Sequence, residues 1–359
     1  MVNKFIIILS SLLLLIPCVK AQSLSGKDAF AVLNLYNSAQ MTSRGLNFIP
    51  RFTDNAPSAL TNPSVLDSSL NGKASVTYTD LFASAYQGAL AFTHTFKKFG
   101  NVGFGLQYIN YGSFKLTEYT GEITGNFSVN DFMLSVGWGK QIEKNLYIGA
   151  TFKPLFSFYE SYTSVALTFD ISATYVSNNK DWQGSVILKN AGRQIHSFHN
   201  ERDTLPFDIQ IGISKQMSHA PLIFYVVAHN TTKWNIKEND KLTSKENISL
   251  DGDNKKENKF SDFLDNGFRH LHFAVDITPS KKWYLSLGYS WKQHKEMNVD
   301  DVLSFAGLSY GIGIKWKQFT LNYARNEYHA YGSPNYITLG YTFSMKNNES
   351  IQNNNGNNF

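Results

Sequence analysis

The chain has 359 residues, a formal net charge of +5 and an aromatic content of 14%. The charge is too small to indicate a nucleic-acid partner, and the length suits either two soluble domains or one membrane barrel. The mean hydropathy of −0.26 looks soluble, but a barrel turns half of its strand residues to a polar interior. The aromatic content is typical of the girdles that flank an outer-membrane barrel.

Residues 1–21 have the pattern of a secretory signal peptide. Lys4 supplies a positive start, residues 5–16 form a short apolar run, and Val19-Lys20-Ala21 is a small-x-small cleavage site. A lipoprotein signal ending at Cys18 is the alternative, which Pro17 disfavours. Cys18 is the only cysteine, so a chain cleaved after Ala21 has no disulfide and no cysteine ligand for a metal.

Residues 22–72 show no strand alternation. Apolar residues such as Phe30, Leu33 and Met41 occur at mixed spacing, and a turn-rich stretch ends in Asn62-Pro63-Ser64. We expect short helical turns that lie in or under a barrel mouth, as a hatch. A flexible linker is the alternative, but linkers rarely carry so many apolar residues.

Residues 73–344 alternate between apolar and small or polar side chains, as strands with one apolar and one wet face do. Several runs reach nine or more residues, which is long enough to cross a bilayer when tilted. The segment Asn335–Ser344 repeats the pattern and ends in Tyr341 and Phe343. We expect it to close the barrel against the first strand, with Tyr341 and Phe343 as part of an assembly signal.

The connections give a second signal, because short ones alternate with mostly longer ones. The short connections are 97–100, 140–145, 177–181, 216–221, 279–282 and 315–318; the others are 110–130, 191–206, 230–267, 293–302 and 326–334. Short periplasmic turns and longer outer loops are typical of outer-membrane barrels. The sequence therefore predicts an all-β, transmembrane antiparallel outer-membrane β-barrel of about 14 strands, followed by a disordered Asn-rich tail, 345–359.

No constellation of residues indicates catalysis, a cofactor or a metal. A barrel hydrolase needs serine, histidine and a polar partner on one outer face, and no such group stands out. Asp170 and Asp276 fall on inward strand faces, where ion pairs with an inward Lys or Arg are expected. Two histidine pairs lack a cysteine or carboxylate at ligand spacing: His196 with His199, and His270 with His272.

The connection 230–267 is the most unusual insert, rich in charges of both signs. It is either a solvated surface loop or a docking surface for an extracellular partner. Docking would need apolar anchors, and the candidates are Trp234, Phe260, Phe263 and Leu264. The last three are spaced i, i+3, i+4, as on one face of a short helix.

From about Ala29 to Phe343 the chain resembles the PorQ family of the type IX secretion system, and more distantly the PorV and long-chain fatty-acid transporter barrels. The matching stretches are Phe30-Ala31-Val32-Leu33-Asn34-Leu35, Ser43-Arg44-Gly45, Asn62-Pro63-Ser64, Gln107-Tyr108-Ile109-Asn110-Tyr111-Gly112, Leu205-Pro206-Phe207-Asp208-Ile209-Gln210, Ala220-Pro221, Arg269-His270-Leu271 and Gly307-Leu308-Ser309-Tyr310-Gly311. The long insert and the tail beyond the closing strand depart from that pattern.

The resemblance implies a non-enzymatic barrel in the outer membrane of a Gram-negative bacterium, with loops at the cell surface. Its expected partners are outer-membrane lipid, a PorZ-like surface protein and, through that protein, a PorU/PorV-like attachment complex that joins cargo to anionic lipopolysaccharide. A passive transporter of hydrophobic solutes, with an apolar pocket behind the hatch, is the alternative.

Overall fold

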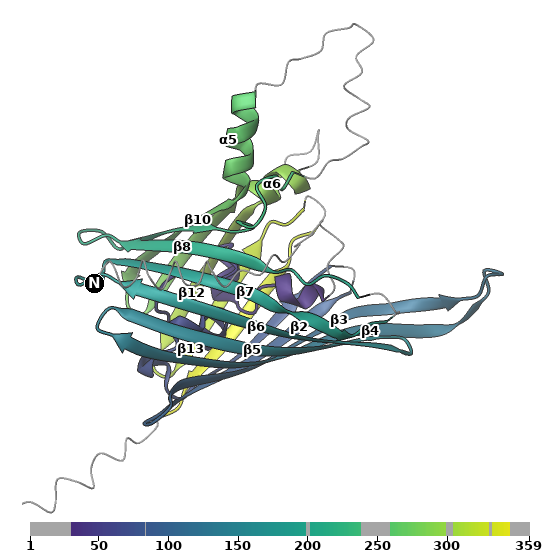
Figure 1. Cartoon of the computed structure of the whole chain (residues 1–359), viewed down its shortest axis with the longest axis horizontal. Coiled ribbons are helices and arrows are strands. Elements are labelled where there is room, and N and C mark those ends of the chain that lie inside the picture. Colours follow the sequence, from purple (N-terminus) through teal and green to yellow (C-terminus); the bar gives the residue numbers. More distant parts are fainter. Residues whose placement is uncertain are drawn as a thin grey trace, which may run out of the picture.

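In this computed structural model, 14 antiparallel strands of the described residues close into a barrel around short helices (Figure 1). The structure describes residues 30–82, 84–198, 202–237, 259–298, 304–329 and 332–344. The helices are η1 (Ala31–Asn34), α2 (Ala39–Thr42), α3 (Ala56–Thr61), η2 (Pro63–Val65), η3 (Ser68–Leu70), α5 (Lys259–Arg269) and α6 (Trp291–Met297). The strands are β1 (Lys73–Asp80), β2 (Tyr86–Phe96), β3 (Gly100–Thr117), β4 (Ile123–Glu143), β5 (Leu146–Tyr159), β6 (Tyr162–Val176), β7 (Trp182–His196), β8 (Asp208–Gln216), β9 (Leu222–Ala228), β10 (Leu271–Ser280), β11 (Trp283–Ser290), β12 (Leu308–Trp316), β13 (Phe319–Asn326) and β14 (Asn335–Thr342).

The first and last strands close the barrel, as the sequence predicted. Antiparallel pairing between β1 and β14 runs without a break from Lys73↔Thr342 to Asp80↔Asn335. Closure leaves no sheet edge with unpaired backbone groups, which a lipid environment would penalise by several kcal/mol per group.

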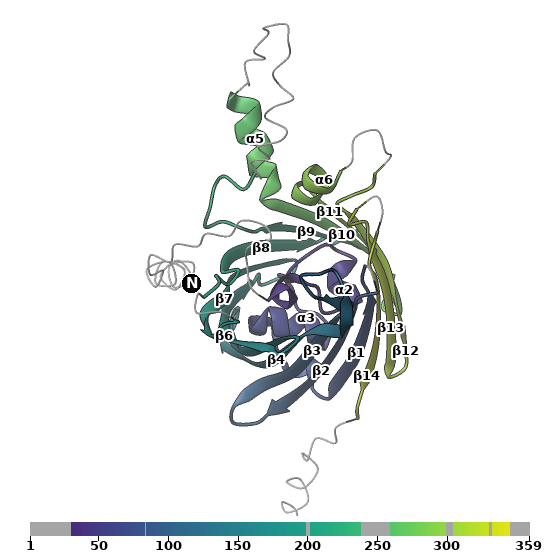
Figure 2. The same cartoon turned by 90° about the vertical axis from the view of Figure 1, so that its right-hand side faces the viewer.

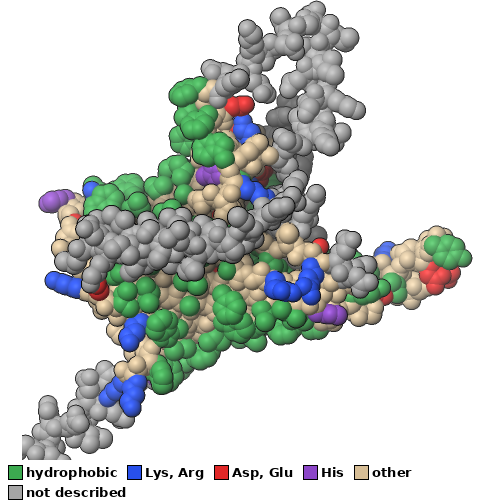
Figure 3. Space-filling model, viewed as in Figure 1, with side chains coloured by type: hydrophobic (Ala, Val, Ile, Leu, Met, Phe, Trp, Pro, Cys, Tyr) green, Lys and Arg blue, Asp and Glu red, His purple; other side chains and the backbone are tan. Residues whose placement is uncertain are grey.

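The strand faces separate lipid from lumen. On β1, Val76 and Tyr78 are 45% and 52% exposed, whereas Thr77 and Thr79, which alternate with them, are buried. The same alternation places apolar side chains around the outside of the barrel, where they cover much of the visible wall (Figure 3). Polar side chains therefore line the interior, which is the arrangement of an outer-membrane barrel.

The segment from Phe30 to Gly72 fills the ring of strands with short helices, and this confirms the predicted hatch against the linker interpretation (Figure 2). Side-chain caps begin α2 and α3: the Ser38 hydroxyl accepts from the Met41 N–H, and the Asn55 carboxamide oxygen accepts from the Ser58 N–H. Apolar residues of the hatch are buried completely against the wall, Leu46 and Phe48 among them. No helix in the described ranges is long and apolar enough to span a membrane.

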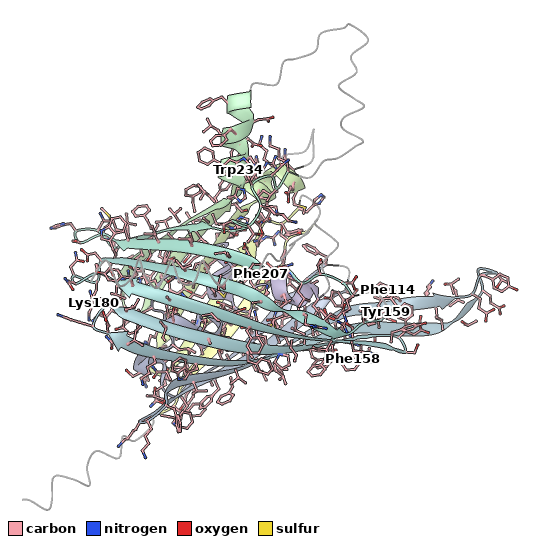
Figure 4. The ribbon with its side chains drawn as sticks, in the orientation of Figure 1. Phe114, Phe158, Tyr159, Lys180, Phe207 and Trp234 are labelled. Carbon is pink, nitrogen blue, oxygen red and sulfur yellow. The ribbon has the colours of Figure 1, made fainter. Side chains whose placement is uncertain are left out.

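The predicted short turns all lie at one end of the barrel, where Lys180 marks the turn between β6 and β7 (Figure 4). The prediction for the opposite end was only partly right. Residues 110–130, expected as a loop, are mostly strand, and β5 joins β6 through only Glu160 and Ser161. The connection 293–302 was also expected to be irregular, but α6 occupies its beginning.

The predicted signal peptide, the Asn-rich tail and residues 238–258 of the insert lie outside the described residues.

Candidate functional site

A buried ion pair fastens the hatch to the barrel wall. The Arg44 guanidinium, just after α2, donates to Asp276 Oδ2 on β10 through Nε at 3.0 Å and Nη2 at 2.6 Å. Tyr225 donates to the same oxygen at 2.9 Å, and Ser286 donates to Oδ1 at 2.6 Å. Both charged side chains are at most 5% exposed. The lumen ion pair expected at Asp276 is therefore present, and its cation comes from the hatch.

The Asp276 carboxylate stabilises the charge of the buried Arg44 guanidinium. Burial alone would lower the pKa of Arg44, but the Asp276 charge outweighs that effect, and the pKa lies above its ordinary value. The guanidinium also lies over the rings of Tyr225 and Tyr284, 5.5 and 5.3 Å from their centroids.

The second expected ion pair, at Asp170, joins two strands of the wall and includes no residue of the hatch. Lys153 on β5 contacts Asp170 on β6 at 2.7 Å and donates to Asn190 Oδ1 at 2.6 Å. Asp170 also accepts from the Asn190 N–H at 2.8 Å. Every charge of this cluster is thus bonded in the interior, as buried charges must be.

Glycines let the hatch approach the wall closely. A Cβ at Gly103 or Gly105 would lie 2.9 or 2.7 Å from the Leu60 side chain, and one at Gly149 would overlap the backbone of Pro63. The absence of a side chain at these positions therefore lets Leu60 and Pro63 lie directly against the wall.

The Asn62-Pro63-Ser64 motif tightens the same contact. Asn62 donates to the backbone oxygen of Ile49 at 2.9 Å, and Ser64 lies 2.6 Å from the Thr174 hydroxyl of β6. The hatch is therefore held by specific polar bonds as well as by apolar packing.

The space left between the hatch and the wall beside Lys153 and Asp170 is small. The cavity lined by Val32, Leu33, Met133, Lys153 and Lys189, among others, has a volume of about 30 Å³. Ligand pockets commonly measure about 300–1,000 Å³. This cavity can hold roughly one water molecule and no hydrophobic solute unless the hatch moves.

The predicted pair His270 and His272 has structural partners. His270 lies 2.9 Å from the backbone oxygens of His229 and of Trp234, and His272 lies 2.7 Å from that of Gly45. His196 is the end of β7, and His199 lies outside the described residues. No group of three His, Cys, Asp or Glu side chains in the described ranges is placed to hold a metal ion.

Beyond the barrel rim, β3 and β4 continue as a hairpin that extends past the other strands (Figure 1). These strands have 18 and 21 residues, against 8 in β1 and 7 in β9. A register shift between Asn110 and Ser113 marks where the extension begins. Apolar residues recur at even spacing here, at Phe114 and Leu116 and at Ile123 and Phe127. This spacing indicates strands, but the sequence-based prediction treated the stretch as a loop.

Aromatic side chains form a row near the base of this hairpin. Phe114 stacks on Phe127, with 5.6 Å between the ring centroids. The centroid distance is 5.4 Å from Phe127 to Tyr159 and 6.2 Å from Tyr159 to Phe198. Phe127 lies four residues from the lumen-facing Asp131 on β4, so it shares that strand face. Phe114 and Tyr159, at 44% and 45% exposed, therefore continue the lumen side of the wall into the surroundings (Figure 4).

The residues predicted for partner binding gather at α5. Trp234 and Phe263 lie 4.9 Å apart, and both line a groove of about 450 Å³ together with Leu264. Phe260 is 67% exposed and does not line the groove. The groove also includes Ala228 and Leu271 of the wall.

The predicted assembly residues lie beside the closing seam. Tyr341 and Phe343 are 4.7 Å apart, and Phe343 also meets Phe92 of β2 at 6.4 Å. The Phe343 N–H donates to the backbone oxygen of Gly72 at 2.8 Å. Phe343 therefore links the end of the last strand to the start of the first strand. The role of Tyr341 and Phe343 in an assembly signal stays a prediction.

No protein-family model and no curated protein matches the chain. Among solved structures, a TodX monoaromatic hydrocarbon channel with the deltaS2 mutation has a TM-score of 0.50 at 11% identity, covering 88% of this chain and 100% of that one. The Pseudomonas putida toluene transporter TodX (TM-score 0.47, 10% identity, 84% and 96%) and a Pseudomonas aeruginosa FadL homologue (0.44, 9%, 86% and 98%) are also similar. At these identities the likeness shows the fold alone: the chain is an outer-membrane β-barrel.

Proposed function

We propose that this chain is a non-enzymatic, PorQ-like barrel that anchors a PorZ-like surface protein beside a PorU/PorV-like attachment complex. The observation that carries the proposal is the aromatic row at the base of the β3–β4 hairpin, in which Phe114 and Tyr159 are exposed. Single exposed apolar residues are ordinary, but a contiguous set in water is typical of a protein-binding surface. Large aromatic side chains are also the usual energetic anchors of such interfaces.

The position of the row supports a partner seated over the barrel mouth. Phe114 and Tyr159 continue the lumen face of the wall and therefore do not face lipid. The hatch that occupies the lumen supports the same function, because a barrel that serves as an anchor needs no open channel. The Arg44–Asp276 pair and the apolar hatch contacts hold that filling in place.

The test compares neighbouring residues on opposite faces of β5. Phe114→Ser combined with Tyr159→Ser should lower recovery of the surface protein, both at the cell surface and in complexes purified in mild detergent. Phe158→Ser is the matched control, because Phe158 is 40% exposed on the other face of the same strand (Figure 4). Barrel levels are equalised by the heat-modifiable band on gels.

The α5 residues predicted from the sequence provide the alternative docking surface. A serine variant of Phe260, Phe263 and Leu264 enters the same assay. Loss of partner in that variant, with full retention in the Phe114 and Tyr159 variant, would move the dock to α5. Full retention in both would remove the support for an anchor on these surfaces.

Transport of a hydrophobic solute is the second candidate. The observation that favours it is the N-terminal hatch inside the lumen, in a fold similar to that of the TodX monoaromatic hydrocarbon channel. The cavity beside Lys153, of only about 30 Å³, weighs against a standing pathway, whereas a second cavity of about 320 Å³ lies between Asp54, Asn55 and the wall at the short-turn end. Uptake of toluene by cells that carry the native barrel, compared with cells that lack it, tests this candidate directly.

A further inference from the structure

The apolar face of α5 is largely exposed. Phe260, Phe263, Leu264 and Phe268 recur at i, i+3, i+4 and i+8, which places them on one side of a helix. Their exposures run from 43% to 67%. Four adjacent large apolar side chains form a patch of the kind that marks an interaction surface.

Contacts on the opposite face fix how α5 is turned. Lys237 lies 2.6 Å from Asp262 and 3.4 Å from Asp265, and the Trp291 indole of α6 donates to Asp265 at 2.8 Å. Arg269 contacts Asp265 at 2.9 Å. The polar side of the helix is thus bound to neighbouring loops and to α6, so the apolar side has one orientation.

That orientation is toward the membrane. α5 stands out from the wall across the strand direction, at the outer end of β10 (Figure 1). Hydrophobic side chains on α5 gather on the side that faces back toward the short-turn end, and charged ones lie on the other side (Figure 3). The apolar face therefore overlooks the lipid-facing surface of the barrel.

The groove is continuous with that surface. Its floor is Ala228 of β9 paired with Leu271 of β10, and the next outward-facing pair along these strands is Val226 with Phe273. The groove of about 450 Å³ between this floor and α5 has the size of a ligand pocket, about 300–1,000 Å³.

We propose that this groove binds an acyl chain of an outer-leaflet lipid, and that α5 lies along the outer surface of the membrane as an interfacial amphipathic helix. Helices of this kind bury an apolar face at the boundary between headgroups and acyl chains and keep charges on the water side. Trp234 at the groove suits the same boundary, where indole rings concentrate. The inference goes beyond the anchoring function and is independent of it, since anchoring uses the hairpin.

The test measures which medium surrounds the apolar face in the full mature chain. Cys18 is the only cysteine in the sequence, so Leu264→Cys gives a single site for a fluorescent thiol label in a chain that begins after the signal peptide. The labelled, heat-modifiable barrel is placed in liposomes of lipopolysaccharide and phospholipid. A nitroxide on the acyl chains and a water-soluble nickel chelate then serve as alternative quenchers. Asp262→Cys, on the opposite helix face, is the matched control.

The expected result is a greater loss of emission with the acyl-chain nitroxide at position 264 and with the nickel chelate at position 262. Quenching at 264 mainly by the nickel chelate overturns the proposal and leaves the face to a protein partner. Protection from both quenchers also overturns it, because protein, either this chain or a second copy, then covers the groove. Should Leu264→Cys fail to assemble, Phe260→Cys carries the label on the same face at its most exposed position.

Discussion

Replacing Arg44 by methionine should release the hatch while the barrel stays closed. The substitution removes both guanidinium bonds to Asp276 and leaves that carboxylate buried with only the Tyr225 and Ser286 hydroxyls as donors. Removing one partner of a buried ion pair typically costs about 3–5 kcal/mol. Two hydrogen bonds remain, so the lower part of that range, about 3 kcal/mol, is expected.

The assay separates hatch release from barrel unfolding. Cleavage of residues 30–72 by a protease added to purified barrels reports release, and so does permeation of a small hydrophilic solute through liposomes that contain the barrel. Heat-modifiable migration on gels reports whether the strands remain closed. Arg44→Met should be cleaved faster and conduct more than the native chain, with unchanged migration.

The double variant Arg44→Met, Asp276→Leu decides whether charge is the cause. Replacing a buried pair by apolar residues is often neutral or stabilising, so the double variant should recover most of the protection. If the single variant is as resistant as the native chain, or the double variant is no better than the single one, the ion pair does not hold the hatch.

Three further outcomes are expected. Gly149→Val should loosen the hatch, because its side chain would overlap the Pro63 backbone. Gly184→Ala should be neutral in the same protease assay, because its Cβ would make only an ordinary contact with the Gly212 carbonyl oxygen at 3.8 Å. Phe343→Asp should lower the amount of assembled barrel in the membrane, and normal levels would refute a role in assembly. Burial lowers the pKa of His229 well below 6.5 in the folded chain, with nearby positive charges acting in the same direction, so the unfolded chain binds a proton first as the pH falls. Stability should therefore be complete above pH 6.5 and decline below it by up to about 1.4 kcal/mol per pH unit, and His229→Gln should reduce that decline in a thermal melt at pH 7.5 and 5.5.

The barrel and its closure could be predicted from the sequence, because successive side chains of a strand point to opposite faces and therefore alternate in polarity. Val76, Thr77 and Tyr78 alternate because lipid and lumen lie on opposite sides of one residue-thick wall. The hatch was predictable for a related reason, since an apolar segment without strand period, such as that around Phe48, must be buried somewhere.

Pairings between distant segments were decided only by the tertiary structure. Asp276 could be expected to meet an inward cation, but its choice of Arg44, 232 residues away, depends on how the hatch sits in the ring. The β3–β4 hairpin was missed because its turn-rich polar composition resembles a loop, and only cross-strand contacts such as Phe114 with Phe127 stabilise it as sheet. The residues of α5 were recognisable as one helix face, yet the medium they face follows from how Lys237 and Trp291 orient the helix against the wall.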